Sequence, residues 1–550
     1  MNRRSPHWPQ WPLLAVLLLG IVALAAVWFA ITRPFSSQDD QEVRRYTEAI
    51  VGTPSRVNPL FASLNDVDRD LVALIFSGLT RLGPTGEVLP DLAQSWQVSD
   101  DGRTYTFRLR PGLTWHTGSP LTSEDVLFTY TLLADPSLKA DPALGQLWRQ
   151  LSCRAPDPLT VQCQLPEPFA PFLTFTTIGI LPKLPLEGTD ASSLFDSRFN
   201  QAPVGSGPFR LALLDQTRAV LKANPNYYLG PPNLDEIELR FFPDHSTATA
   251  ALRRGEVDGL LLGTTASPED LQTLNADDRL RSYTTNRTSF TLLYLNNIRP
   301  PFDDLRVRQA MAHTIDVDAI ISNLLEGRAV HANSPIVPGT WASNPDLEPY
   351  PHDLGKARNL LDEAGWLEKD GSRQKDSVEL RLTIMTDQDP LRTAIAEEIA
   401  GQLQKVGIQA TVAPQGATEL VRDFLVPHQY QAAVFGWDPG ADPDPYPAWH
   451  SSQTGDQGRN LAGYFSEKAD KDLEEARQTT DLSRRQALYF AFQKTFYDDV
   501  PSILLYYPVF TYFVSKEING IRLGILFDPA SRFANVQEWT PEKDSKLLRQ

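Results

Sequence analysis

The chain has 550 residues, 41% of them hydrophobic and 10% aromatic, which is typical of a folded protein too large for a single hydrophobic core. Its formal net charge is −17, from 51 Lys and Arg against 68 Asp and Glu. This acidity argues against nucleic-acid binding, which needs Lys and Arg to displace the counterions of the phosphates. We therefore expect two or three domains and no nucleic-acid partner.

The first predicted element is an uncharged apolar segment, Leu13–Ile31. As a helix, its 19 residues would span about 28 Å, enough to cross the hydrocarbon core of a membrane. Two arginines precede it, as in a signal peptide or an anchor. Cleavage after Ala23-Leu24-Ala25 is the alternative, but the apolar run continues beyond that point. We predict an uncleaved membrane anchor over residues 1–33, followed by a polar linker over 34–42.

Strands and amphipathic helices then alternate along the chain. Apolar spacing and end signals predict each element, with Thr122 or Ser123, Asp389 and Asp481 at helix starts. This rhythm indicates an α/β protein with helices on the faces of its sheet. Strands are expected at 46–51, 105–109, 378–385, 408–412 and 503–514, and helices at 66–79, from 122, at 389–406 and at 481–498.

The only two cysteines, Cys153 and Cys163, flank the turn signal Pro156-Asp157-Pro158. Short extended runs on both sides allow the two thiols to face each other across a hairpin. A disulfide there would imply an oxidising compartment, whereas two buried free thiols are the alternative. We predict the disulfide.

One stretch, Gly436–Gln453, concentrates acidic and aromatic side chains in a loop stiffened by four prolines. Carboxylates beside aromatic faces suit a ligand that carries both a cation and apolar groups. An acidic surface turn is the alternative interpretation. The side chains concerned are Trp437, Asp438, Asp442, Asp444, Tyr446 and Trp449.

Signatures of catalysis are weak in this sequence. Gly205-Ser206-Gly207 lacks the surroundings of a nucleophile elbow, and Gly355-Lys356 lacks the rest of a phosphate-binding loop. The eight histidines are scattered, without the spacing of a zinc site. Two aspartates acting as a glycosidase pair have no further support. We expect a protein that is not an enzyme and has no metal or cofactor.

An ordered series of motifs resembles one family, the extracytoplasmic solute-binding proteins of ABC importers, oligopeptide/dipeptide/nickel class (solute-binding protein family 5). The resemblance covers residues 43–539. It is carried by Leu89-Pro90-Asp91-Leu92-Ala93, Asp101–Arg110, Pro203–Phe209, Asn224–Tyr228, Ala250–Asp258, Asn296–Phe302, Val307–Ala310 and Ala364-Gly365-Trp366.

This resemblance implies a bilobed, periplasmic-binding-protein-like α/β fold of type II, in the large three-subdomain variant, to which the apolar run Leu13–Ile31 adds the N-terminal transmembrane segment predicted above. Lobe 1 would comprise 43–287, with a subdomain at 81–200, and would be completed by 515–545. Lobe 2 would comprise 288–514. Hinge strands would lie near 290–297 and 506–515, and the ligand would be enclosed between the lobes.

The resemblance also implies a function: capture of a peptide-like solute outside the cytoplasm and delivery to ABC transporter permease subunits by a membrane-anchored monomer. One alternative is a different solute, such as an oligosaccharide, an opine or a metal chelate. The other is a solute receptor that does not take part in transport. Peptide-binding relatives hold the ligand's ammonium on an aspartate a few residues after the tryptophan, but here Gly440-Ala441 occupies that place. Either Asp438 or Asp442 replaces that clamp, or the ligand has no free amine. Trp341 and Asn296 complete the expected ligand-binding set.

Overall fold

The computed structural model describes residues 43–140, 142–455 and 458–542. The chain divides into two compact units, Met1–Arg44 and Arg45–Gln550, and nearly all described residues belong to the second. The predicted anchor at 1–33 and linker at 34–42 lie outside the described residues. Within the described ranges, no helix combines the length and the apolar character that a membrane crossing requires.

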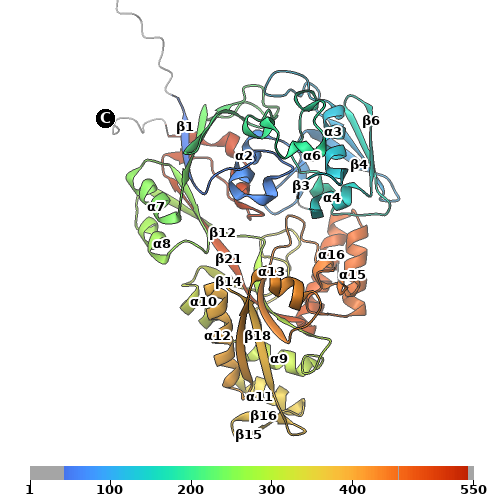
Figure 1. The fold of residues 1–550 in the computed structure, drawn as a ribbon, viewed down its shortest axis with the longest axis vertical. Helices are drawn as coiled ribbons and strands as arrows, with labels where there is room; N and C mark the ends of the chain where they lie inside the picture. The colour runs from blue at the N-terminus through green and yellow to red at the C-terminus, as the bar shows by residue number, and fades with distance from the viewer. Residues whose placement is uncertain (1–42, 141, 456–457, 543–550) are drawn as a thin grey trace, which may run out of the picture. The chain divides into compact units, whose positions relative to one another are not determined.

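The second unit is organised around one long strand, β21 (Ser502–Ser515), in a 12-stranded mixed sheet. Its residues are mostly apolar or aromatic, as suits a strand covered on both faces. The first half of β21 pairs with β13 (Phe290–Leu295), and the second half pairs with β11 (Gly259–Leu262) and β12 (Leu280–Asn286). Figure 1 shows β21 running between these two parts of the sheet. We call the part that contains β11 the N-terminal half-sheet and the part that contains β13 the C-terminal half-sheet.

The N-terminal half-sheet has the strand order β11-β1-β10-β9-β8. α7 (His245–Arg254) connects β10 to β11; Asp244 caps its start, and Gly255 ends it at a φ of +70°, which glycine adopts without strain. The other elements here are β1 (Arg45–Val51), α2 (Asp66–Ile75), β8 (Phe209–Leu214), β9 (Arg218–Ala223), β10 (Glu236–Phe242) and α8 (Pro268–Asn275).

A separate antiparallel sheet, β4-β5-β7-β6, lies within residues 93–164. Cys153 and Cys163 are directly opposite each other in the β6–β7 hairpin and are joined by a disulfide, with a Cα–Cα distance of 4.1 Å. Two helices accompany this sheet, and Thr122 caps the first with a capping box. The elements are β4 (Ala93–Val98), β5 (Thr104–Leu109), α3 (Ser123–Ala134), α4 (Pro142–Trp148), β6 (Ser152–Asp157) and β7 (Thr160–Gln164).

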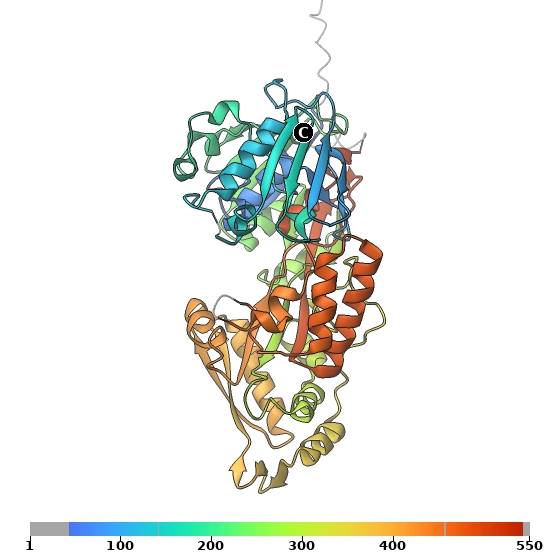
Figure 2. The same cartoon turned by 90° about the vertical axis from the view of Figure 1, so that its right-hand side faces the viewer.

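The C-terminal half-sheet separates two hydrophobic cores. Successive side chains of β13 point to opposite faces: Leu293 lies in the core shared with α9 to α12, and Leu292 in the core shared with α15 and α16. Figure 2 shows α15 and α16 side by side. The elements are α9 (Leu305–Thr314), α10 (Val317–Leu324), α11 (Leu354–Glu363), β18 (Arg381–Asp387), α12 (Pro390–Gln404), β19 (Gln409–Gln415), β20 (Ala432–Trp437), α15 (Glu467–Gln478) and α16 (Leu482–Asp499).

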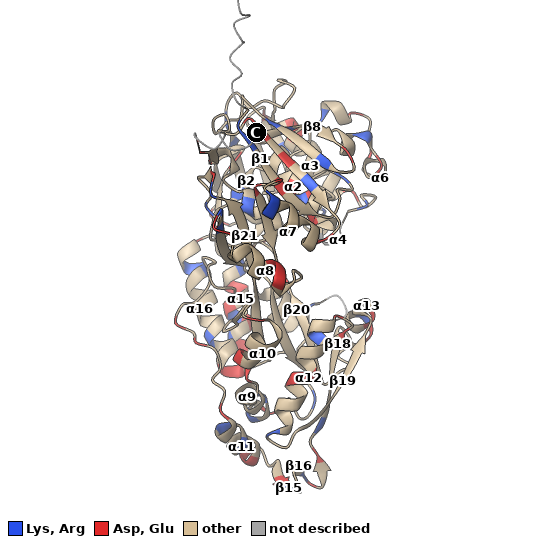
Figure 3. Ribbon diagram, turned by 90° about the vertical axis from the view of Figure 1, so that its left-hand side faces the viewer, with Lys and Arg blue, Asp and Glu red and all other residues tan. Residues whose placement is uncertain are grey.

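A buried ion-pair cluster fastens the segment after β21 to the N-terminal half-sheet. Arg532 donates to Glu48 and, through both terminal nitrogens, to Asp70, each at 2.8 Å. Burial raises the pKa of Asp70 to about 6, although Arg532 opposes this shift. Elsewhere acidic and basic residues are interspersed along the elements seen in Figure 3. The remaining short elements include β2 (Thr80–Leu82), β3 (Val88–Pro90), α5 (Phe172–Phe175), α6 (Ala191–Leu194), β14 (Ala329–His331), β15 (Leu367–Lys369), β16 (Ser372–Lys375), β17 (Val378–Glu379), α13 (Ala417–Glu419), α14 (Tyr446–Trp449), β22 (Ile518–Asn519) and β23 (Thr540–Pro541).

Candidate functional site

An apolar pocket lies where the chain crosses from β12 to β13 and meets the loop after β20. The space in it that a water-sized sphere can occupy is about 10 Å³, so in this conformation the pocket has room for about one water molecule. The pairing of Phe290 with Trp437 brings these two segments together. Proline, aliphatic and indole groups form most of the wall, as expected for a small-molecule site. The lining residues are Thr288, Pro335, Ile336, Val337, Thr340, Trp437, Pro439, Gly440, Ala441, Pro443, Pro445 and Trp449.

The loop holds its shape through its own aspartates. In each case one carboxylate oxygen accepts from the backbone N–H two residues further on, at 3.0 or 3.1 Å. Asp438 binds Gly440 in this way, Asp442 binds Asp444, and Asp444 binds Tyr446. These are Asx turns, which let a segment without regular structure keep a fixed backbone.

Asp442 is engaged by a buried arginine. Its two carboxylate oxygens accept from Arg485 at 2.6 and 3.0 Å, and only 12% of the aspartate side chain and 7% of the arginine side chain are exposed. Burial lowers the pKa of Arg485, but Asp442 and its neighbours outweigh that effect and leave the pKa raised. Thr174 also donates to Asp442, at 3.2 Å. The Asp442 carboxylate therefore has a structural role in this geometry.

Asp444 has a similar arrangement with a second arginine. Arg477 donates through Nε to the Asp444 carboxylate at 2.8 Å. Burial raises the pKa of Asp444, and Arg477 opposes that rise. The Arg477 guanidinium also lies over the ring of Tyr446, 4.1 Å from its centroid, a cation–π contact. Tyr446 and Asp444 thus share one arginine.

Asp438 is the most accessible of the three aspartates of the loop. Its side chain is 44% exposed and forms an ion pair with Arg287, whose Nη2 lies 3.1 Å from Oδ2. Because exposed pairs of this kind contribute little to stability, Asp438 is better suited than its neighbours to a role in recognition.

The predicted aromatic residues have different environments. Trp437 is partly buried and lines the pocket. Trp449 also lines it but is 1% exposed, with its ring 4.7 Å from that of Phe496 in an edge-to-face contact. Trp341 is partly buried beside Arg485, whose guanidinium lies 5.3 Å from its ring. Tyr446 stacks on His450 at 4.1 Å. Of these predicted residues, Trp437 and Trp449 meet in the pocket.

Asn296 is placed differently from its predicted role. It follows the end of β13 distant from Trp437, and the six residues from Phe290 correspond to about 20 Å of strand. Its amide donates to the carbonyls of His428 and Tyr430 at 3.0 and 2.8 Å. Asn296 is fully buried and stabilises that loop, so its expected contact with ligand is not supported by its position.

Several residues of the site were absent from the sequence prediction. Arg477 and Arg485 lie on α15 and α16, far along the chain from the aspartates that they bind. Thr288, Ile336 and Val337 belong to segments without any distinctive motif. Only the position of Thr288, at the predicted lobe boundary, marked it in the sequence.

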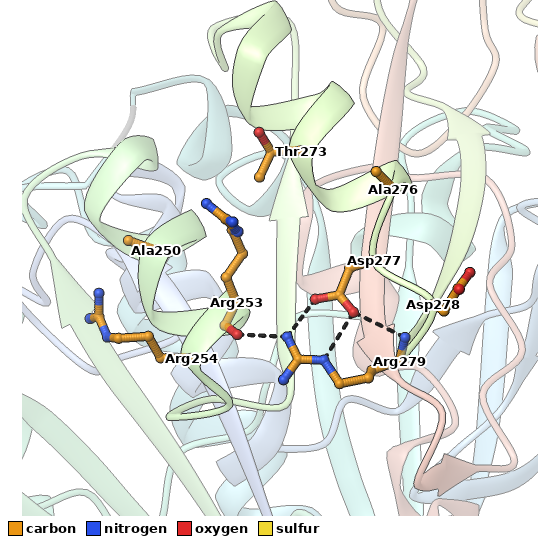
Figure 4. Close-up of a pocket in the computed structure, with 8 residues that line it drawn as sticks. All are labelled: Ala250, Arg253, Arg254, Thr273, Ala276, Asp277, Asp278 and Arg279. Carbon is orange, nitrogen blue, oxygen red and sulfur yellow. Dashed lines mark hydrogen bonds and ion pairs between the residues drawn. The ribbon is translucent and has the colours of Figure 1, made fainter.

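A second hollow, between α7, α8 and the start of β12, is a poorer candidate (Figure 4). It is lined mainly by charged groups, and Arg279 is already paired with Asp277 at 2.6 Å. No aromatic side chain lines it. The apolar pocket is therefore the stronger candidate of the two.

Comparison with known proteins identifies the family. Residues 87–459 match the model described as bacterial extracellular solute-binding proteins, family 5 middle. The oligopeptide-binding protein AppA of Bacillus subtilis is 28% identical over 89% of this chain and 90% of its own length; its structure with a nonapeptide gives a TM-score of 0.67, covering 91% and 99% of the two chains. The dipeptide-binding protein of Escherichia coli is 29% identical over 88% and 93%.

A nickel-related structure is similarly close. NikZ of Campylobacter jejuni, solved in complex with Ni(L-His), is 29% identical, with a TM-score of 0.69 over 90% of this chain and 99% of that one. Relatives solved with different ligands thus share this fold. The chain belongs to the bacterial extracellular solute-binding proteins of family 5.

Proposed function

We propose that the chain is the extracytoplasmic binding component of an ABC importer and captures a peptide-like solute for delivery to membrane permease subunits. The observation that carries this proposal is the apolar pocket walled by Trp437, beside the strand shared by both half-sheets. Two of the relatives described above are an oligopeptide-binding and a dipeptide-binding protein. The role is binding, without catalysis.

The proposed lobes are 43–287 completed by 515–545, and 288–514, with a subdomain at 81–200. Their support is the grouping of buried side chains: one core combines residues 46–239 with 512–539, whereas two others fall almost entirely between 290 and 507. Several contacts cross the proposed boundary, including Ala170 N–H to the Arg477 carbonyl at 2.7 Å and Trp341 N–H to the Thr85 carbonyl at 2.9 Å. Such contacts would stabilise a closed state that a ligand favours.

The N-terminal segment would hold this binder at the outer face of the membrane. Leu13–Ile31 supplies the apolar length for an anchor, and tethering raises the effective concentration of the binder near its permease. Mass spectrometry of the mature protein tests this: an intact N-terminus supports the anchor, and a start near residue 26 refutes it.

Isothermal titration calorimetry tests the ligand class. The full chain would be titrated with a pool of tripeptides made from Ala, Leu and Phe, with a panel of oligosaccharides and with Ni(II)–L-histidine. The chelate is the second candidate, because NikZ is as similar to this chain as the peptide-binding relatives are. Binding of the pool supports the proposal, whereas tight binding of a sugar or the chelate with no response to peptides would overturn it.

A further inference from the structure

Thr288, which lines the apolar pocket, and the preceding Arg287, which does not, each carry a buried polar group without a hydrogen-bond partner among the described residues. The hydroxyl of Thr288 is buried, and this residue, 3% exposed, lines the pocket. Nε of the adjacent Arg287 is likewise buried without a partner. An unsatisfied buried polar group costs about 1–3 kcal/mol, so two of them on adjacent residues, one of which lines the pocket, need a physical explanation.

The backbone fixes both residues in place. Arg287 N–H donates to the Pro508 carbonyl at 3.3 Å, on the central strand β21. Thr288 N–H donates to the Leu526 carbonyl at 2.9 Å. The side chains thus project from an ordered crossing between β12 and β13. Their unused hydrogen-bonding groups therefore have fixed positions.

Asp438 orients Arg287 from the other side. Its Oδ1 accepts from Gly440 N–H at 3.0 Å, and its Oδ2 accepts from Arg287 Nη2 at 3.1 Å. Each carboxylate oxygen therefore already accepts one hydrogen bond, whereas Nε of the guanidinium has no acceptor among the described residues. This arrangement favours a ligand atom that accepts hydrogen bonds over one that donates them.

We infer that Arg287 and Thr288 form a subsite for an acceptor oxygen of the ligand, a carbonyl or a carboxylate, and that Asp438 positions Arg287 instead of binding an ammonium. The wall formed by Ile336, Val337 and Trp437 takes an apolar side chain next to that oxygen. This inference rests on the proposed function, because it describes how the same pocket recognises a peptide. Such a site is indifferent to whether the ligand's amine is free.

Thr288→Val tests the hydroxyl with little change in shape. Because that hydroxyl has no partner in the described part of the chain, the ligand-free variant should be as stable as the wild type or more stable, while affinity for the tripeptide pool falls about 3- to 10-fold. A purely structural threonine would give the opposite sign for stability. Thr249→Val is the matched control: Thr249 also carries a buried hydroxyl without a partner, but it lies in α7, outside the pocket, so affinity should not change.

The pool would be titrated in free, N-acetylated and C-amidated forms, against wild type, Thr288→Val, Arg287→Gln and Asp438→Asn. We expect acetylation to change affinity less than about twofold and Arg287→Gln to weaken binding more than Asp438→Asn. Loss of affinity on amidation would identify a carboxylate as the acceptor, and its retention a carbonyl.

Unchanged affinity in Thr288→Val would overturn the inference and leave the peptide-binding function intact. So would loss of binding on acetylation together with loss of binding in Asp438→Asn, which would identify an ammonium clamp. If wild type binds no form of the pool, the proposed function fails, and this inference fails with it.

Discussion

Replacing Asp442 by asparagine would test whether the acidic loop is structural. The substitution leaves Arg485 buried and charged, with one carboxylate partner lost. Breaking a buried ion pair costs about 3–5 kcal/mol. Asparagine retains one acceptor oxygen, and Asp444 also interacts electrostatically with Arg485, so we expect the free energy of unfolding to fall by about 2–3 kcal/mol.

Urea unfolding followed by tryptophan fluorescence measures this change. Asp438→Asn is the control, because its ion pair is exposed and should contribute less than about 1 kcal/mol. Combining Asp442→Asn with Arg485→Gln should be less destabilising than the sum of the single changes, since no unpaired charge remains. The reasoning is refuted if Asp442→Asn keeps the stability of the wild type.

Further predictions concern stability elsewhere in the chain. Burial raises the pKa of Asp91 from 3.8 to about 7, so between these pH values the folded state retains a proton that the unfolded state releases. The free energy of unfolding should therefore decline as pH rises from about 4 to 7. Melting temperatures measured over this range should decline less steeply for Asp91→Asn than for the wild type. Replacing Cys153 and Cys163 by alanine opens a loop with a sequence separation of 10 and should cost about 2–3 kcal/mol in urea unfolding, or nothing if the bridge is absent in solution. Trp449→Ala should cost about 3–5 kcal/mol, because this residue is buried, whereas Trp437→Ala should chiefly weaken ligand binding in calorimetry; similar stability losses for both would contradict this difference.

Local signals in the sequence predicted most elements of the fold. The helices capped by Asp389 and Asp481 are confirmed, as is the capping threonine Thr122. The helix expected over 66–79 ends earlier, at Ile75, because the Ile75 carbonyl accepts from Gly207 N–H at 2.8 Å, a contact formed by a distant turn. No local pattern encodes such a contact.

The strands that pair with β21 could not be predicted from the sequence for the same reason, because they are distant along the chain. A hydrophobic run over 503–514 predicts a strand, but its neighbours depend on segments hundreds of residues away. The exchange of partners along β21 is what joins the two half-sheets and creates the pocket beside the β12–β13 crossing. Periodicity reports which faces are buried and not against what they pack.

The role of the aspartates in the loop 436–453 could not be predicted either, because it depends on which side chains surround them. Three aspartates in a short run suggest a cation site while their surroundings are unknown. In the structure each uses Oδ1 for its own turn and also accepts from an arginine: Asp438 from Arg287 and Asp444 from Arg477 through Oδ2, and Asp442 from Arg485 through both oxygens. A ligand ammonium at Asp442 would have to displace Arg485, whose side chain is 7% exposed, and leave that arginine buried without its main partner, which is strongly unfavourable. The carboxylates therefore preorganise the wall around Trp437, and discrimination falls to groups that the folded chain leaves unsatisfied.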